Sequence, residues 1–200
     1  MNFFKDLFHT KQLSMQKSKP DEASLQRQKT YHGIKDADEL IALGMKYYSG
    51  QGVAQNFGTA KELFQLAAKQ GHSQAMYLLG NLYNRGEGVE QDLNEAFRWF
   101  HLAANQDGKM VNAIARFSVG TFFRDGLGVA QSYADAARWF YSAAEMGYDE
   151  AQFSLGLMYL NGQGVAINLG EAMRWWQMAA NQGNSKAKSS LLLLKNYGGK

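Results

Sequence analysis

A glycine-rich phrase of a kind that can bind phosphate occurs four times in the 200-residue chain. The phrase is G-x-G-V, and its valines are Val53, Val89, Val129 and Val165. A dinucleotide site needs a third glycine between a strand and a helix, and a nucleotide P-loop needs a lysine followed by serine or threonine. None of the four copies meets either requirement. We therefore interpret the phrase as a chain reversal rather than as a phosphate site.

Acid–base pairs that could suggest catalysis also recur. They are three residues apart, at the same place in three copies of a repeated pattern: Glu95/Arg98, Asp135/Arg138 and Glu171/Arg174. Pairs at this spacing on a solvated helix face contribute a few tenths of a kcal/mol, roughly, to helix stability. Because they recur with the repeat, we predict that they support the surface of the fold and do no chemistry.

Other catalytic or metal-binding patterns are missing from the sequence. The histidines are dispersed at His9, His32, His72 and His101, and no H-E-x-x-H or G-x-S-x-G phrase occurs. S-x-x-K occurs at residues 14–17 and 185–188, but without the S-D-N and K-T-G phrases that accompany it in β-lactamases. The absence of cysteine excludes disulfides, thiolate nucleophiles and thiolate metal ligands. We predict no catalytic residues, no metal and no cofactor, so the chain is not expected to be an enzyme.

The glycine phrase belongs to a longer unit that predicts two helices. An alanine follows each valine by seven residues, and a double alanine closes each unit. Apolar residues recur every three or four positions on either side of the phrase, which is the period of a helix. We expect the first helix of each unit, helix A, at 37–49, 74–84, 114–124 and 150–160. We expect the second, helix B, at 58–69, 94–105, 134–145 and 170–181.

Two further recurrences predict how these helices pack. One glycine lies inside every helix A: Gly44, Gly80, Gly120 and Gly156. Glycine there costs about 1 kcal/mol relative to alanine, so its recurrence predicts close approach of the paired helix. Aromatic pairs flanked by alanines recur in helix B and form a tryptophan column: Trp99/Phe100, Trp139/Phe140 and Trp175/Trp176. Their helical spacing predicts a column of core side chains.

The units differ from one another at three places. The first has Leu63 where the others have tryptophan, as expected of a terminal repeat. The spacing between Gly80 and Gly120 is 40 residues where the other two intervals are 36, and the four extra residues lie within 105–112. Either helix A of the third unit starts earlier or its loop bulges. A last helix at 187–197 replaces Leu-Gly by Leu191–Leu192 and is expected to be a cap.

Residues 1–30 do not match the repeat. Residues 1–35 hold seven Lys/Arg against three Asp/Glu, whereas the remainder holds 14 against 15. We predict a flexible basic leader in which Phe3, Phe4, Leu7 and Phe8 share one face of a short amphipathic helix within residues 1–10. That helix would dock on a membrane or partner, or fold back onto the first repeat. It does not resemble a signal peptide, because no basic segment precedes the apolar cluster.

The charge balance bears on partners and location. A nearly neutral repeat body argues against nucleic-acid binding, which needs a concentrated basic surface. No stretch has the roughly 18 consecutive apolar residues of a membrane span. We expect a cytoplasmic monomer whose only membrane contact would be through residues 1–10.

The repeated unit resembles the Sel-one-like repeat family, relatives of the tetratricopeptide repeat. The shared pattern is A-x-x-x-L-G-x-x-Y-x-x-G-x-G-V, followed by A-x-x-W-x-x-x-A-A-x-x-G. Within a domain at 31–200, it gives units at about 37–72, 73–108, 113–148 and 149–184, and a cap at 187–197. The resemblance implies an all-α, right-handed superhelical solenoid of antiparallel helix pairs. It also implies a scaffold, an adaptor, or a regulatory or neutralising partner of another protein. The cysteine-rich relatives, described as secreted, match poorly.

In this family helix A lines the concave face, where a protein or peptide would bind. Aligning the helices on their Leu-Gly pairs places ten candidate partner-binding residues in columns on that face: Tyr77, Phe117 and Phe153; Asn81, Thr121 and Leu157; Asn84, Arg124 and Leu160, with Arg85 beside them. Aromatic and arginine side chains are common anchors of interfaces. The alternative is that the aromatic column packs against a neighbouring helix.

Two other functions stay open from the sequence. Some relatives are regarded as hydrolases of cell-wall or β-lactam compounds, and the phenylalanine-rich start could tether an adaptor to a membrane. We favour the non-enzymatic protein-interaction module, because no nucleophile and base occur in a recognisable pattern.

Overall fold

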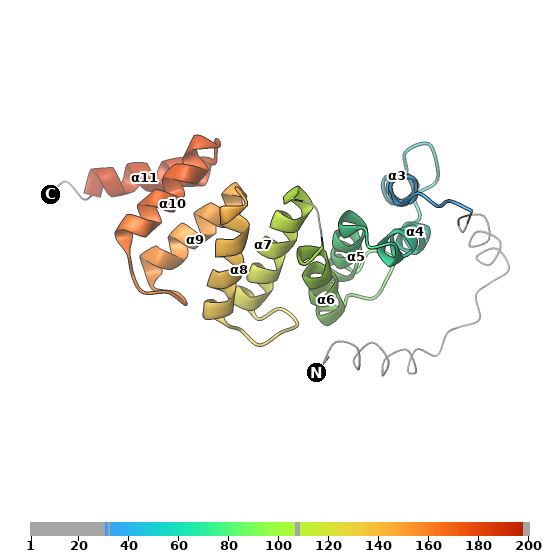
Figure 1. Cartoon of the computed structure of the whole chain (residues 1–200), viewed down its shortest axis with the longest axis horizontal. Helices are drawn as coiled ribbons and strands as arrows, with labels where there is room; N and C mark the ends of the chain where they lie inside the picture. Colours follow the sequence, from blue (N-terminus) through green and yellow to red (C-terminus); the bar gives the residue numbers. More distant parts are fainter. Residues whose placement is uncertain (1–30, 32, 107–108, 198–200) are drawn as a thin grey trace. The chain divides into compact units, whose positions relative to one another are not determined.

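The computed structural model describes residues 31, 33–106 and 109–197 (Figure 1). The chain divides into two compact units, residues 1–35 and 36–200. The expected leader and its amphipathic helix lie outside the described residues.

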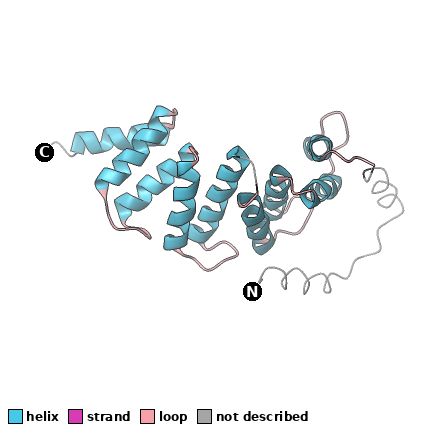
Figure 2. Cartoon of the chain, viewed as in Figure 1, coloured by secondary structure: helices cyan, strands magenta, loops and turns pink. Residues whose placement is uncertain are grey.

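Every regular element in the described part of residues 36–200 is a helix (Figure 2). The helices A are α3 (Ala37–Ser49), α5 (Ser73–Arg85), α7 (Lys109–Asp125) and α9 (Asp149–Asn161). The helices B are α4 (Phe57–Lys69), α6 (Leu93–Ala104), α8 (Tyr133–Glu145) and α10 (Leu169–Asn181), and α11 (Ser185–Tyr197) is last. Each helix packs against the next along the chain. None of the described helices is both long and apolar enough to cross a bilayer.

The helices B begin at the same kind of cap. A side-chain oxygen accepts a hydrogen bond from the backbone amide three residues later in every case: Asn56, Asp92, Ser132 and Asn168. Such a cap contributes about 1 kcal/mol to helix stability. The caps fix where each helix B starts, one residue earlier than the sequence predicted.

The glycine phrase is a chain reversal, as predicted. Both of its glycines are left-handed in all four copies, with φ between 65° and 75°. The second glycine also packs closely on the preceding unit, because a Cβ at Gly128 would lie 2.5 Å from the carbonyl carbon of Leu93. Gly88 and Gly164 are equally confined by Phe57 and Tyr133 at the starts of the two other preceding helices B. The phrase therefore joins neighbouring units as well as turning the chain.

The glycine inside each helix A makes room for a ring of helix B. A Cβ at Gly80 would lie 2.6 Å from Phe100, and one at Gly120 would lie 2.6 Å from Phe140. The close approach that the sequence predicted is confirmed. In this way one ring of each unit becomes almost fully buried: Phe64, Phe100, Phe140 and Trp176.

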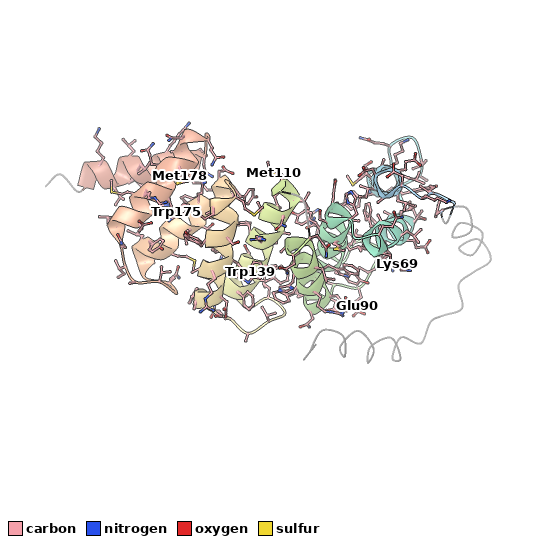
Figure 3. All side chains as sticks on the ribbon, viewed as in Figure 1. Lys69, Glu90, Met110, Trp139, Trp175 and Met178 are labelled. Carbon is pink, nitrogen blue, oxygen red and sulfur yellow. The ribbon has the colours of Figure 1, made fainter. Side chains whose placement is uncertain are left out.

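The predicted tryptophan core is only partly correct. Trp175 is fully buried, but Trp99 and Trp139 are half-buried. The next residue along the helix points at the glycine of helix A and takes the central place instead. Figure 3 labels Trp139 on α8 and Trp175 on α10.

The four extra residues of the third unit lengthen its helix A. α7 has 17 residues where the other helices A have 13, and it begins at Lys109. Four residues correspond to about one turn. Of the two alternatives, the earlier helix start is therefore the one observed.

The last helix begins two residues before its predicted start. The Asn184 side chain accepts a hydrogen bond of 3.0 Å from the backbone amide of Ala187 and so caps the first turn of α11. Its amide group also donates to Asp149 at 3.0 Å, which ties α11 to the start of α9.

An aromatic contact connects helices B of neighbouring units. His101 of α6 packs edge-to-face on Trp139 of α8, with centroids 5.5 Å apart. Tyr141 of α8 packs in the same way on Trp175 of α10, at 5.7 Å. Burial lowers the pKa of His101 from its ordinary value of 6.5.

We expect His101 to make the fold less stable in mild acid. Its pKa is lower in the folded than in the unfolded protein, so the unfolded state binds the proton more readily. The free energy of unfolding should therefore fall as the pH decreases from about 6.5 towards the folded pKa. Urea denaturation across this range, at constant ionic strength, measures the slope. His101→Gln should flatten it, and an unchanged slope in that variant would assign the effect to other groups.

Candidate interaction surface

The candidate site residues lie on helices α5, α7 and α9, of which α5 and α7 contact each other directly. We call the side of these helices that carries the ten candidate residues the helix A face. All of its members except Arg85 are half-buried, and Arg85 is exposed. The face thus consists mainly of side chains that pack on one side and meet solvent on the other.

The aromatic column packs on rings of helix B. Tyr77 lies 5.5 Å from Phe100, and Phe117 lies 5.3 Å from Phe140, between ring centroids. Phe153 stacks on Trp176 at 6.2 Å. These three rings therefore have a structural role, and only their outer edges are left for a partner.

The amide and hydroxyl side chains of the face differ in how far they are satisfied. Thr121 donates its hydroxyl to the carbonyl oxygen of Phe117 at 3.1 Å. Asn81 and Asn84 have no hydrogen-bonded side-chain partner within the described part of the chain. Each carboxamide keeps two donors and an acceptor for a ligand. Their spacing of three residues places them as neighbours on one face of α5.

The two arginines of the face are differently engaged. Arg124 makes a bidentate pair with Asp125, with N–O distances of 2.7 and 2.8 Å. This hydrogen bonding raises the pKa of Arg124 and lowers the pKa of Asp125. Arg85 is more loosely held, since it donates to the Tyr48 hydroxyl at 3.2 Å and lies 3.7 Å from Glu87. Arg85 is therefore the freer cation.

The C-terminal end of the face is apolar and partly covered. Leu157 and Leu160 of α9 pack, together with Leu191 and Leu194 of α11, against a cluster that contains Trp176. Their main contribution is to hold α11 on the stack. The most polar part of the face is therefore on α5.

The predicted acid–base pairs are present and dispersed. Their N–O distances are 2.5 Å for Arg98–Glu95 and 3.0 Å for both Arg138–Asp135 and Arg174–Glu171. Each lies within one helix B and at a separate unit, so they do not assemble into one site. Among the described residues no three His, Asp or Glu side chains gather as a group able to hold a metal ion.

Two sets of contacts were missed at the level of sequence. The first three units each contain a glutamine whose side-chain amide donates to a backbone carbonyl oxygen near the end of helix A, at 2.7–2.9 Å. These residues are Gln55, Gln91 and Gln131. The recurrence of glutamine at this position of the unit could have predicted the contact from the sequence. The fourth unit has the exposed Ile167 at the same position. The other is the hydrogen bond of 2.7 Å from Tyr48 to Glu87, which joins the first two units. Together with desolvation it raises the pKa of Tyr48. No repeated pattern in the sequence predicts the contact between Tyr48 and Glu87.

The chain is similar to solved Sel1-type structures. A Sel1 repeat protein from Oxalobacter formigenes is 31% identical with a TM-score of 0.74, over 80% of this chain and 64% of that one. A protective antigen of uropathogenic Escherichia coli strains with an SLR fold is 32% identical with a TM-score of 0.79, over 90% and 37%. The chain therefore spans less than two thirds of either structure. Cysteine rich protein B of Helicobacter pylori, 19% identical with a TM-score of 0.53 over 68% and 100%, shares the fold. No curated protein matches the sequence.

The comparisons and the helices agree on the architecture, which is a helical repeat solenoid. Proteins of this kind are generally protein-interaction modules rather than catalysts. The Sel1 repeat model matches residues 40–72, 73–108, 113–148 and 149–184, which is most of the chain. The chain belongs to the Sel1 repeat family.

Proposed function

We propose that the chain is a non-enzymatic scaffold that binds a peptide or protein segment along the helix A face. The observation that carries this proposal is the pair of half-buried carboxamides of Asn81 and Asn84, for which the described residues provide no side-chain hydrogen-bond partner. A carboxamide can donate to a backbone carbonyl and accept from a backbone amide. Two of them, one turn apart, suit an extended peptide better than they suit a small apolar ligand.

The neighbouring side chains support the same proposal. Arg85 is more than half exposed, at 57% of its side-chain surface, and could pair with a carboxylate of the partner. The outer edges of Tyr77 and Phe117 provide apolar contact beside the amides. Such a mixture of aromatic, amide and arginine groups is typical of protein interfaces.

We expect Asn81→Ala/Asn84→Ala to weaken partner binding by tenfold or more. Leaving buried polar groups of the partner unpaired costs about 1–3 kcal/mol for each group. A random dodecapeptide library displayed on phage supplies the probes, and fluorescence anisotropy of the selected peptides measures the affinity. The free energy of unfolding should change little, because neither carboxamide has a hydrogen-bond partner in the part of the chain that the structure describes.

A matched control tests whether the effect is specific to the helix A face or follows the loss of any two exposed carboxamides. Asn94→Ala/Asn161→Ala removes two exposed carboxamides that lie outside the candidate set and should leave the affinity unchanged. Selected peptides that bind both double variants as tightly as the unmodified protein would refute the helix A face as the binding surface.

A further inference from the structure

The outer side of α11 carries two exposed leucines. Leu192 is 58% exposed and Leu193 is 56% exposed. Leu191 and Leu194, on the opposite side, pack against the cluster that contains Trp176. The four consecutive leucines therefore divide into one pair that holds the helix in place and one pair that meets solvent.

The register of the repeat gives Leu192 a particular place. It lies eight residues after the capping Asn184, as Gly44 lies eight residues after the capping Asp36. The repeat alignment places a glycine at the equivalent position of each complete unit, where it lies under a ring from helix B: Gly44, Gly80, Gly120 and Gly156. Leu192 thus marks a side of helix A against which this fold packs a second helix. No element of the described part of the chain covers it.

Two lysines flank this leucine. Lys188 precedes it by four residues and Lys195 follows it by three, so all three lie on one side of the helix. Neither lysine has a side-chain partner among the residues that the structure describes, whereas Lys186 pairs with Glu150 at 3.0 Å. Residues 185–200 contain four lysines and no acidic residue. The surface is therefore apolar at its centre and cationic at both ends.

We propose that this surface, formed by Lys188, Leu192, Leu193 and Lys195, docks an acidic amphipathic helix of a partner protein. The helix would lie where helix B lies in the other units, with carboxylates facing the two lysines. Small side chains would face Leu192, because a leucine at the glycine position leaves no space for a ring. This docking surface lies on α11, outside the ten residues of the helix A face, although Leu193 continues the column of Asn81, Thr121 and Leu157. The proposal does not depend on the function proposed for that face.

Charge and register favour this occupant over the others. Two copies of α11 would bring like charges together, which disfavours self-association. A lipid surface would also accept a basic helix with exposed leucines. We favour a helix as the occupant because the four glycines that are equivalent to Leu192 each pack against a helix B.

The test uses the full chain and a pair of fluorescein-labelled synthetic peptides. One is an alanine-rich helix of about 18 residues with glutamates on either side of an alanine stripe, long enough to be partly helical. The other has lysine at every glutamate position. Fluorescence anisotropy should detect saturable binding of the acidic peptide alone. Leu192→Asp should weaken it about tenfold or more, as for a central interface residue. Lys188→Glu/Lys195→Glu should reverse the preference, so that the variant binds the basic peptide.

Ile167→Asp is the matched control, because Ile167 is 73% exposed and lies outside α11. It should leave binding unchanged, and circular dichroism should give all variants the same helicity. The proposal is overturned if the acidic peptide fails to bind at about millimolar concentration, a range of very weak affinity. It is overturned too if Leu192→Asp binds normally. A dimer that this variant abolishes would assign the surface to a second copy, and tighter binding to phosphatidylglycerol vesicles would assign it to lipid.

Discussion

Replacing Gly164 by alanine is expected to lower the free energy of unfolding by about 2–5 kcal/mol. Part of this loss comes from the left-handed backbone conformation of Gly164, whose φ is 71°. A residue with a side chain in this conformation costs about 1–2 kcal/mol. The rest comes from the new methyl group, which would overlap the carbonyl oxygen of Tyr133. Relieving such an overlap typically costs about 1–3 kcal/mol. Urea denaturation followed by circular dichroism measures the change.

Gly52→Ala separates the two contributions. Gly52 has nearly the same backbone conformation, with φ of 75°, but no atom lies within 4 Å of the position that its Cβ would take. We expect only the conformational cost, about 1–2 kcal/mol. Equal losses in the two variants would mean that the contact of Gly164 with the preceding unit adds nothing to stability.

Phe140→Ala is expected to lower the free energy of unfolding by about 3–5 kcal/mol, the usual range for a buried phenylalanine. The ring is fully buried, packs on Phe117 at 5.3 Å and occupies the space that Gly120 leaves open. Tyr141→Ala is the matched control on the same helix. Its side chain is 47% exposed, so we expect a loss of about 1 kcal/mol.

A double-mutant cycle tests the pairing of ring and glycine. In the unmodified protein Gly120→Ala should be destabilising, because its Cβ would lie 2.6 Å from Phe140. In the Phe140→Ala background the same change should be much less harmful or even favourable, since alanine is the better helix former by about 1 kcal/mol. Additive effects would show that the two residues are energetically independent.

Much of the fold could be predicted from the sequence because its elements repeat. The glycine phrase, the double alanine and the helical spacing of the apolar residues occur four times, so a chance match at one unit is corrected by the others. The helix ends followed to within one or two residues, except at the start of α7. That helix is four residues longer than the other helices A, and its extra turn does not repeat.

The buried aromatic of helix B was harder to predict. Phe100 follows Trp99 directly and both are large and apolar, so the repeated pattern marked the two residues together without deciding which of them is central. The outcome depends on which side chain points at Gly80, and this is decided by how the two helices are rotated against each other.

The candidate surface could be located on helix A but not evaluated from sequence. The same alignment placed Asn81 and Thr121 in one column. In the structure the Thr121 hydroxyl bonds within its own helix, whereas the Asn81 side chain has no hydrogen-bond partner among the described residues. Arg124 was an attractive anchor, yet Asp125 holds it in a bidentate pair. Which polar groups remain available depends on side-chain neighbours that differ between the units.

The packing of each helix mainly on its neighbours along the chain has a consequence for cooperativity. A stack held together in this way can lose a terminal unit at the cost of one interface, while the central units stay folded. A partner that touched α5, α7 and α9 together would bind only when all three units are folded. Its binding energy would therefore be shared among them. Hydrogen exchange should then slow throughout these units when the partner binds, so that separate local openings merge into a single event.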